Sequence, residues 1–421
     1  MVVAAVVPVA TGWDVRAGFG PLSAHWDPRL TRGSIAAVAL ALGALLHAQR
    51  LGSLLSWRRL LAAAWLASTG WVLSLALVDG SAGLATRADT TDYMTAARGV
   101  TDVSALLPHF VSRIPIDAPS SWPVHVAGHP PGTLLFFLLL QRIGLGDPAV
   151  GLVLALLAAT APVAVLVTLR VLGAEDAARA AAPFLVFAPA AVWEAVSGDA
   201  AFMSLSCWAL TCLAIGAARR SIVWSMVAGG LLGGCVLMSY GLVLLVLLVL
   251  AITVSTRSLR QLPWVAGTFT VVVAGFAVAG YSLFAAYPAL RQRYWDGIAA
   301  DRPASYWLWG NLAALCFSAG PVLGAAVACA ISRRRVVWAR STTGRGATGS
   351  AALALGGAAI LAVLAADVSR MSKAEVERIW LPFIPWLLVL TALLPPRWRR
   401  PLLGVQLLTA LLVQHLLRTI W

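Results

Sequence analysis

Two carboxylates stand three residues apart in the stretch DTTDY, where Asp89 and Asp92 precede Tyr93. On a helix this spacing places both side chains on one face. Neighbouring carboxylates raise one another's pKa, so that either can act as a general base. The stretch therefore predicts a proton acceptor, with the choice open between Asp89 and Asp92. The competing interpretation is a solvated loop with an aspartate at a helix N-terminus.

Two histidines flank a short turn in HVAGHPPG, at His125 and His129. Four residues apart they could share a metal ion, but no third ligand is adjacent, so contact with a substrate is the preferred interpretation. Pro130 and Pro131 can begin a helix, because proline suits the first helical turn. The segment 133–143 that follows is too short to cross a bilayer, which predicts a re-entrant or surface-lying helix.

Further polar groups stand at the ends of apolar segments. Glu194 and Asp199 lie in VWEAVSGDAAF, and acids near the end of an apolar helix suggest a polar cavity. Tyr240 lies at the next turn on the same side, a position also typical of aromatic residues at a membrane surface. In KAEVERIWLPF, Glu377 and Arg378 enter an apolar helix. An arginine there could clamp a phosphate, or pair with a neighbouring glutamate.

The rest of the composition is typical of a polytopic membrane protein. Of 421 residues, 60% are hydrophobic and 11% are charged, against about 25% charged residues in soluble domains. The apolar runs do not alternate as in a β-barrel. We therefore expect an all-α polytopic membrane protein, a single domain over 1–421 with about twelve transmembrane helices. The predicted spans are 35–49, 60–79, 147–170, 180–196, 201–218, 221–238, 241–256, 263–287, 306–331, 349–366, 379–394 and 402–418.

The longest stretch without a full span is 80–146, and it carries the aspartate and histidine motifs. Loops beyond about 15 residues are usually functional or disordered, so this one is predicted to be a large outer catalytic loop. Arginine-rich loops at 333–335 and 397–400 lie on the opposite side, which the positive-inside rule assigns to the cytoplasm. The net charge of +14 does not indicate nucleic-acid binding, because the arginines form no continuous basic face.

The order of these motifs resembles the GT-C superfamily of integral-membrane glycosyltransferases, nearest to the protein O-mannosyltransferases and aminoarabinose lipid A transferases. Those proteins carry an acidic pair before a tyrosine, then H-P-P-L, then a second outer acid. Here DTTDY, HPPG and SGDAAF follow in that order. Asp89 lies four residues before Tyr93, in register with the family's base, whereas Asp92 is one residue off the second acid. The arginine-rich, lysine-poor composition adds the expectation of a small form from a high-GC bacterium.

The resemblance implies a GT-C-like fold and a sugar donor carried on a polyprenyl phosphate. A pentose or hexose, such as arabinose or mannose, would pass with inversion to an envelope glycan, lipid or protein. The active site would face the outer side of the bacterial plasma membrane, among membrane lipid. A divalent cation is left open as a cofactor, with no metal ligand assigned. Two alternatives also stay open, a twelve-span secondary transporter and a lipid-linked sugar flippase. The candidate residues are Asp89 and Asp92 for catalysis and Arg87, Tyr93, His125, His129, Asp199, Tyr240, Glu377 and Arg378 for substrate binding.

Overall fold

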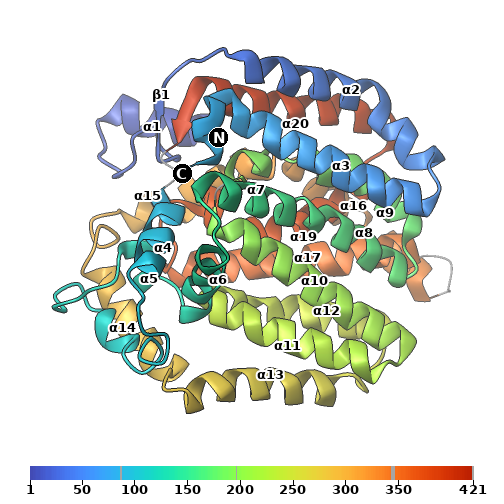
Figure 1. Cartoon of the computed structure of the whole chain (residues 1–421). Coiled ribbons are helices and arrows are strands. Elements are labelled where there is room, and N and C mark those ends of the chain that lie inside the picture. The colour runs from blue at the N-terminus through green and yellow to red at the C-terminus, as the bar shows by residue number, and fades with distance from the viewer. Residues whose placement is uncertain (86–87, 196, 343–346, 420–421) are drawn as a thin grey trace.

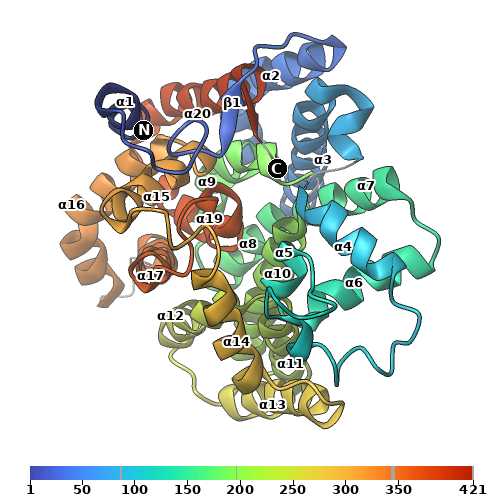
Figure 2. The ribbon, with the colours of Figure 1, turned by 90° about the vertical axis from the view of Figure 1, so that its left-hand side faces the viewer.

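Most of the structure is helical; it is a computed structural model that describes residues 1–85, 88–195, 197–342 and 347–419. The long helices run side by side in one general direction (Figure 1), and Figure 2 views the bundle from one end. The α-helices are α1 Val2–Thr11, α2 Arg32–Leu54, α3 Trp57–Ala76, α4 Ala88–Arg98, α5 Val124–Ala127, α6 Pro131–Arg142, α7 Asp147–Ala158, α8 Thr160–Val171, α9 Glu175–Val186, α10 Gly198–Arg219, α11 Ile222–Met238, α12 Val246–Thr256, α13 Leu262–Val278, α14 Leu283–Trp295, α15 Ala304–Ser318, α16 Val322–Thr342, α17 Ala347–Ser369, α18 Val376–Ile379, α19 Ile384–Leu388 and α20 Pro396–Leu416. The 3-10 helices are η1 Leu77–Leu84, η2 Val111–Arg113, η3 Pro189–Trp193, η4 Tyr240–Leu245, η5 Leu381–Phe383 and η6 Val389–Leu393.

A small sheet joins segments from the two ends of the chain. Strand β1 Ala24–Trp26 pairs antiparallel with β2 Leu417–Thr419, in the register that sets His25 opposite Arg418. Because β2 directly follows α20, the sheet holds the segment before α2 against the end of the last helix. Both termini lie near this sheet (Figure 1).

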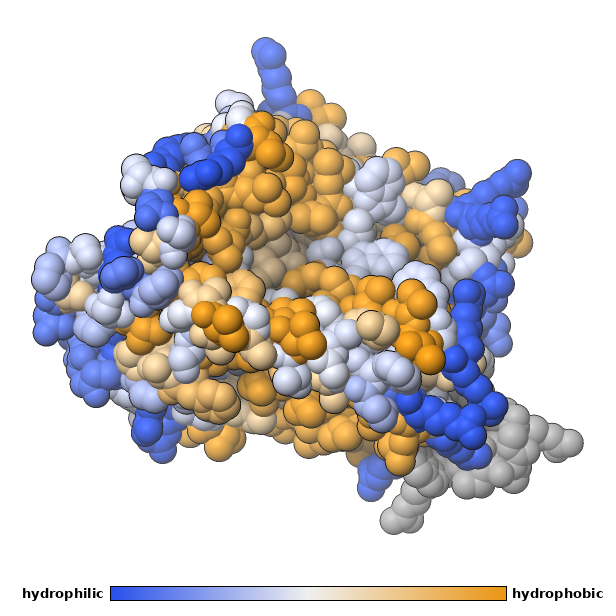
Figure 3. All heavy atoms as spheres, turned by 60° about the horizontal axis from the view of Figure 1, so that its bottom comes forward, coloured by the Kyte–Doolittle hydropathy of each residue, from blue (hydrophilic) through white to orange (hydrophobic). Residues whose placement is uncertain are grey.

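Apolar surface covers the middle of the molecule between two hydrophilic ends. Figure 3 shows hydrophobic residues across this face and hydrophilic residues at its left and right. On α13, Val271 and Val278 are 71% and 91% exposed. Large apolar surfaces of this kind belong against another protein or a membrane, and helices of membrane-spanning length favour the membrane. The chain is therefore an all-α membrane protein, as the sequence predicts.

Five helical segments are long and apolar enough to cross a membrane without a break. Two further pairs of helices meet the same requirement only when each bent pair is taken as one span. The described residues therefore hold five to seven candidate spans by length and composition, and several of the twelve predicted segments are shorter helices. The five unbroken segments are Arg32–Leu54, Trp57–Leu84, Asp147–Val171, Gly198–Arg219 and Gly349–Ser369.

Two of the predicted spans are bent. The segment 263–287 divides into α13 and α14, which meet at 73°, and 306–331 divides into α15 and α16, which meet at 104°. Gly280 (φ 100°) and Gly320 (φ 86°) lie at the two breaks, in the left-handed conformation that favours glycine. Hydropathy predicted one span in each case, and the structure corrects each to two helices joined at a bend.

Two other predicted spans, 180–196 and 379–394, are buried and divided into short pieces. In the first, α9 ends at Val186 and η3 begins at Pro189. In the second, Pro382 lies in η5 and Pro385 in α19. Proline has no amide N–H to continue a helix. Such breaks are tolerated at membrane depth where surrounding protein covers the backbone, as it does here.

The predicted outer loop is an ordered cap, which we define as residues 88–142. It contains α4, α5 and α6 and lies at the end of the bundle that faces the viewer in Figure 2. Its own apolar core includes Tyr93, Phe110, Trp122 and Phe137, together with Tyr281 from the break between α13 and α14. The cap is therefore fixed to the bundle by side-chain packing.

Helix α6 confirms the helix predicted after HPPG, and it begins at Pro131. Its twelve residues extend about 18 Å, well short of a bilayer core of about 30 Å. The Thr133 hydroxyl donates a 2.6 Å hydrogen bond to the carbonyl of Met238, at the end of α11. Gly132 packs so closely on Leu237 that a Cβ would collide with the Leu237 carbonyl.

We predict that Gly132→Ala destabilises the protein by about 1–3 kcal/mol, because the added methyl group has no space. Gly230→Ala is the matched control, since Gly230 lies in helix α11 with open space at its Cβ position. The control should be neutral or slightly stabilising, because alanine is the better helix former. Thermal unfolding in detergent measures both variants. Equal unfolding midpoints would contradict the close packing of α6 on α11.

Candidate functional site

The ion pair between Arg378 and Asp199 joins segments that are 179 residues apart. Arg378 Nη1 lies 2.5 Å from Asp199 Oδ2, and the two side chains are 3% and 2% exposed. Ser197, at the start of α10, accepts a hydrogen bond from the Asp199 amide at 3.1 Å and donates one to Asp199 Oδ2 at 3.2 Å. The first turn of a helix also favours negative charge. The structure thus brings together two of the predicted site residues.

A second carboxylate, Glu375, extends this pair into a chain of charges. Glu375 Oε2 lies 3.4 Å from Arg378 Nη2, and Oε1 lies 3.1 Å from Arg302 Nη2. Arg302 also donates to the Lys373 carbonyl at 2.7 Å, and the Lys373 ammonium donates to the Arg302 carbonyl at 2.9 Å. The sequence interpretation assigned no role to Arg302 or Lys373. The signal available for Lys373 was that it is the only lysine in the chain.

In the cap, Asp92 holds His125. His125 Nδ1 lies 2.7 Å from Asp92 Oδ2, and the same oxygen accepts a hydrogen bond from the His125 amide at 3.3 Å. Burial works to raise the pKa of Asp92, but the hydrogen bonds and charge of His125 outweigh burial and lower this pKa. The Asp92 side chain is 30% exposed, so a substrate can reach it. A carboxylate bonded in this way fixes the orientation of an imidazole.

Tyr93 connects the same histidine to His129. The Tyr93 hydroxyl donates to the His125 carbonyl at 3.0 Å and lies 2.7 Å from His129 Nδ1. His129 Nδ1 is also 2.9 Å from the His125 carbonyl. The Tyr93 ring stacks on Phe137 of α6, with centroids 4.8 Å apart. These contacts fix α4, α5 and α6 relative to one another.

His129 belongs to the cap and contacts helix α10, which carries Asp199. Burial has the largest effect on its pKa and lowers it. The charge of Asp199 and the His125 carbonyl act in the opposite direction, while the charges of Arg378 and His125 lower the pKa further. The His129 ring is also 5.3 Å from the ring of Phe202 on α10. His129 therefore joins the Asp92–His125 pair to the start of α10, where Asp199 pairs with Arg378.

Two predicted residues cannot be compared with the structure. Arg87, and the side chain of Asp89, lie outside the described residues. The choice between Asp89 and Asp92 as base therefore stays a prediction. Among the side chains that are described, no group of three or more His, Cys, Asp or Glu residues is arranged to hold a metal ion.

Two other predicted residues lie in α18 and η4. Glu377 is completely buried, next to Arg378 in the sequence. Tyr240 begins η4, and its hydroxyl bonds the Tyr281 hydroxyl at 3.0 Å. The contacts of Tyr240 are thus with the aromatic core of the cap, whereas Glu377 belongs to the segment that carries Arg378.

Comparison with the sequence models of known protein families gives no match, and comparison with curated proteins gives none either. Function is therefore inferred from the arrangement of these side chains. A reachable carboxylate with a histidine can accept and relay a proton. A guanidinium held between two carboxylates can stabilise an anion that takes the place of one of them.

We predict that Asp199→Asn and Arg378→Gln each destabilise the protein by about 3–5 kcal/mol, because each removes one partner of a buried ion pair. Arg98→Gln is the matched control. Arg98 and Asp147 also lie 2.5 Å apart, but with side chains 51% and 30% exposed, so its loss should cost less than about 1 kcal/mol. Chemical or thermal unfolding measures all three. Similar losses for the buried and the exposed pair would contradict this assignment.

We predict that acid destabilises the protein through His129. Because its folded-state pKa is lowered, the stability it contributes is complete above the unfolded pKa of about 6.5 and is lost as the pH falls below that value. His129→Gln, which cannot take up a proton, should therefore flatten the decline of the melting temperature below about pH 6.5. His109→Gln, at an exposed histidine of the cap, serves as the control. An unchanged decline in the His129 variant would refute the prediction.

Proposed function

We propose that this protein is a GT-C-like glycosyltransferase that moves a sugar from a polyprenyl-phosphate donor to an acceptor hydroxyl at the outer face of the membrane. The observation that carries the proposal is that the hydrogen-bonded cluster of Asp92, His125 and His129 packs through His129 on Phe202 of α10, three residues from Asp199 and its pair with Arg378. These groups come from three distant segments at one end of an apolar bundle. A lipid-linked donor presents its phosphate at the membrane edge, where a site built from these groups would receive it.

Proton transfer would occur at the cap. The acceptor oxygen forms a bond to the anomeric carbon as its proton passes to a carboxylate, Asp92 or Asp89. A positioned base of this kind contributes roughly 10²–10⁴-fold to the rate. Asp92 either takes the proton itself or orients His125 to take it, and the 2.7 Å contact supports both routes. Attack opposite the leaving group gives inversion at the anomeric carbon.

The leaving group would depart toward Arg378. The bond between the anomeric carbon and the phosphate oxygen breaks, and its electron pair stays on the polyprenyl phosphate. A guanidinium aimed at the developing charge stabilises it best in a site that excludes water. Arg378 is almost fully buried, which supports this role. Asp199 and His129 would border the sugar, with the donor chain extending into lipid.

The proposal includes the twelve-crossing topology that the sequence predicts, with the cap on the outer side. In this topology each bent pair, α13 with α14 and α15 with α16, makes one crossing. The arginines of the short loops between crossings would then lie on the cytoplasmic side of the plasma membrane. The sugar, the acceptor class and any divalent cation are not assigned by these contacts.

We predict that replacing the base, by Asp92→Asn or by Asp89→Asn, lowers sugar transfer by about 10²–10⁴-fold, and that the double variant shows at least this loss. The assay uses purified protein in lipid nanodiscs with polyprenyl-phosphate mannose or arabinose and an envelope extract, and mass spectrometry follows the release of polyprenyl phosphate. Asp117→Asn is the matched control, at an exposed aspartate of the same cap. Full turnover in the single variants and in the double variant would reject the assignment of the base.

His125→Asn separates the two routes for the proton. If Asp92 acts through His125, His125→Asn and Asp92→Asn should lose activity to a similar extent. If Asp92 accepts the proton directly, the histidine variant should lose much less. Donor-dependent release by the unmodified protein is the precondition for this comparison, and its absence with both donors would count against the proposed donor class.

A further inference from the structure

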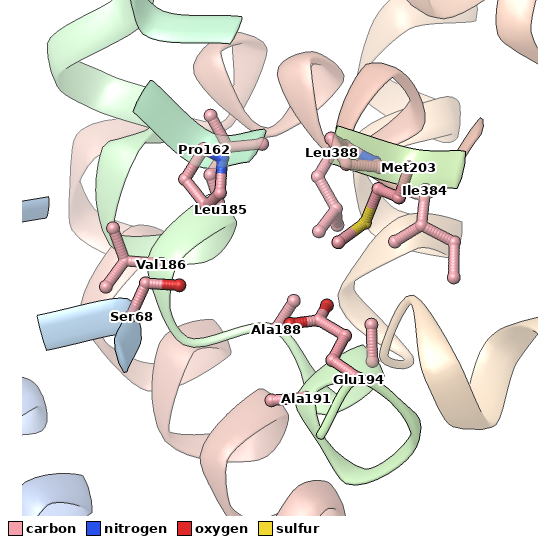
Figure 4. Close-up of a pocket in the computed structure, with 12 residues that line it drawn as sticks. Ser68, Pro162, Leu185, Val186, Ala188, Ala191, Glu194, Met203, Ile384 and Leu388 are labelled. Carbon is pink, nitrogen blue, oxygen red and sulfur yellow. The ribbon is translucent and has the colours of Figure 1, made fainter. Parts of the chain in front are cut away.

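A small cavity lies inside the bundle, where α3, α8, α9, α10 and α19 meet (Figure 4). It has space for roughly one water molecule. Most of its lining is apolar, contributed by residues such as Pro162, Leu185, Met203 and Ile384. The cavity is separate from the cap and takes no part in the proposed sugar transfer.

Two polar side chains point into this cavity. Glu194 follows η3 and is 6% exposed, and Ser68 of α3 is 3% exposed. Figure 4 shows the Glu194 carboxyl group and the Ser68 hydroxyl directed into the same space. Within the described part of the chain, no protein group makes a hydrogen bond or ion pair with either side chain. Their polar atoms thus face the cavity itself.

The surroundings supply little to balance a negative charge. The residues that line the cavity include no basic side chain, and the titratable neighbour from α10 is the thiol of Cys207. An isolated carboxylate in such a place is very costly, so it is neutralised by a proton or by a bound cation.

Size and ligand number decide between these two occupants. Hard cations such as Ca²⁺ and Mg²⁺ are surrounded by six or more oxygen ligands. Here the side-chain oxygens that line the space are those of one carboxyl group and one hydroxyl, around a space for roughly one water. A proton needs no such shell. A protonated carboxyl group can also donate to a water that Ser68 holds from the other side.

We propose that Glu194 is a proton-binding site in the core of the bundle, where its protonated carboxyl group and Ser68 hold a single water molecule. The ligand is a proton, and the site goes beyond the proposed glycosyl transfer. Glu194 precedes Asp199 by five residues in the connection between η3 and α10. Ionisation at Glu194 would therefore place an uncompensated charge next to the segment that holds Arg378.

Infrared spectroscopy of the full-length protein in nanodiscs tests this site, because the carbonyl band of a protonated carboxyl group is distinct from that of a carboxylate. At neutral pH we expect the spectrum to contain such a band that is lost in Glu194→Gln and retained in Glu175→Gln. Glu175 is the matched control, since its carboxyl group forms salt bridges with Arg170 and Arg179. Ser68→Ala should shift the band without removing it, which provides a second reading if the glutamine variant does not fold.

Three outcomes would overturn the proposal. The Glu194-dependent band could be absent at neutral pH, it could fail to shift in Ser68→Ala, or it could appear only when Na⁺ is replaced by choline. The last result would identify a cation as the occupant. None of these measurements depends on sugar transfer, so failure here is distinguishable from failure of the proposed glycosyltransferase activity.

Discussion

A guanidinium buried in an apolar bundle must be neutralised, and this requirement determines the arrangement at the candidate site. Arg378 satisfies it through Asp199 at 2.5 Å and Glu375 at 3.4 Å. Asp199 lies in the first turn of α10 and Arg378 lies in α18. The ion pair therefore fixes the relative position of two segments that are far apart in the sequence. The cap then packs on α10 through His129, whose ring lies 5.3 Å from the ring of Phe202.

The sequence predicted the helical class and most helix positions because hydropathy measures what must be buried or face lipid. It also predicted the helix after HPPG, since Pro131 can occupy a first helical turn. It failed at the bends near Gly280 and Gly320, because an apolar run is equally apolar when its backbone turns. Buried prolines such as Pro189 and Pro385 were visible in the sequence, but their effect on span length depends on the protein that surrounds them.

For the site, residue types and motif order indicated candidate residues, but they did not indicate which of these residues contact one another. Both Asp199 and Arg378 were candidate substrate-binding residues, but their ion pair with each other was not predicted. The partner of Asp92 could not be predicted, because His125 follows 33 residues later and reaches it only through the folded cap. Arg302 was missed for the same reason. Hydropathy does not indicate that a polar residue in a loop will be buried. Arg302 is buried where it contacts Glu375, and that contact forms only in the folded chain.

The two carboxylates on Arg378 are not equivalent, and this difference determines how a phosphate could reach the guanidinium. Asp199 is 2% exposed and makes the shorter contact, whereas Glu375 is 19% exposed and shares its charge with Arg302. Glu375 also has a left-handed backbone at φ 63°, which is strained for a residue other than glycine. Movement of Glu375 would relieve that strain while its oxygen remained on Arg302. A phosphate would therefore replace Glu375 and leave the pair with Asp199 intact, because releasing Asp199 would strand a fully buried charge.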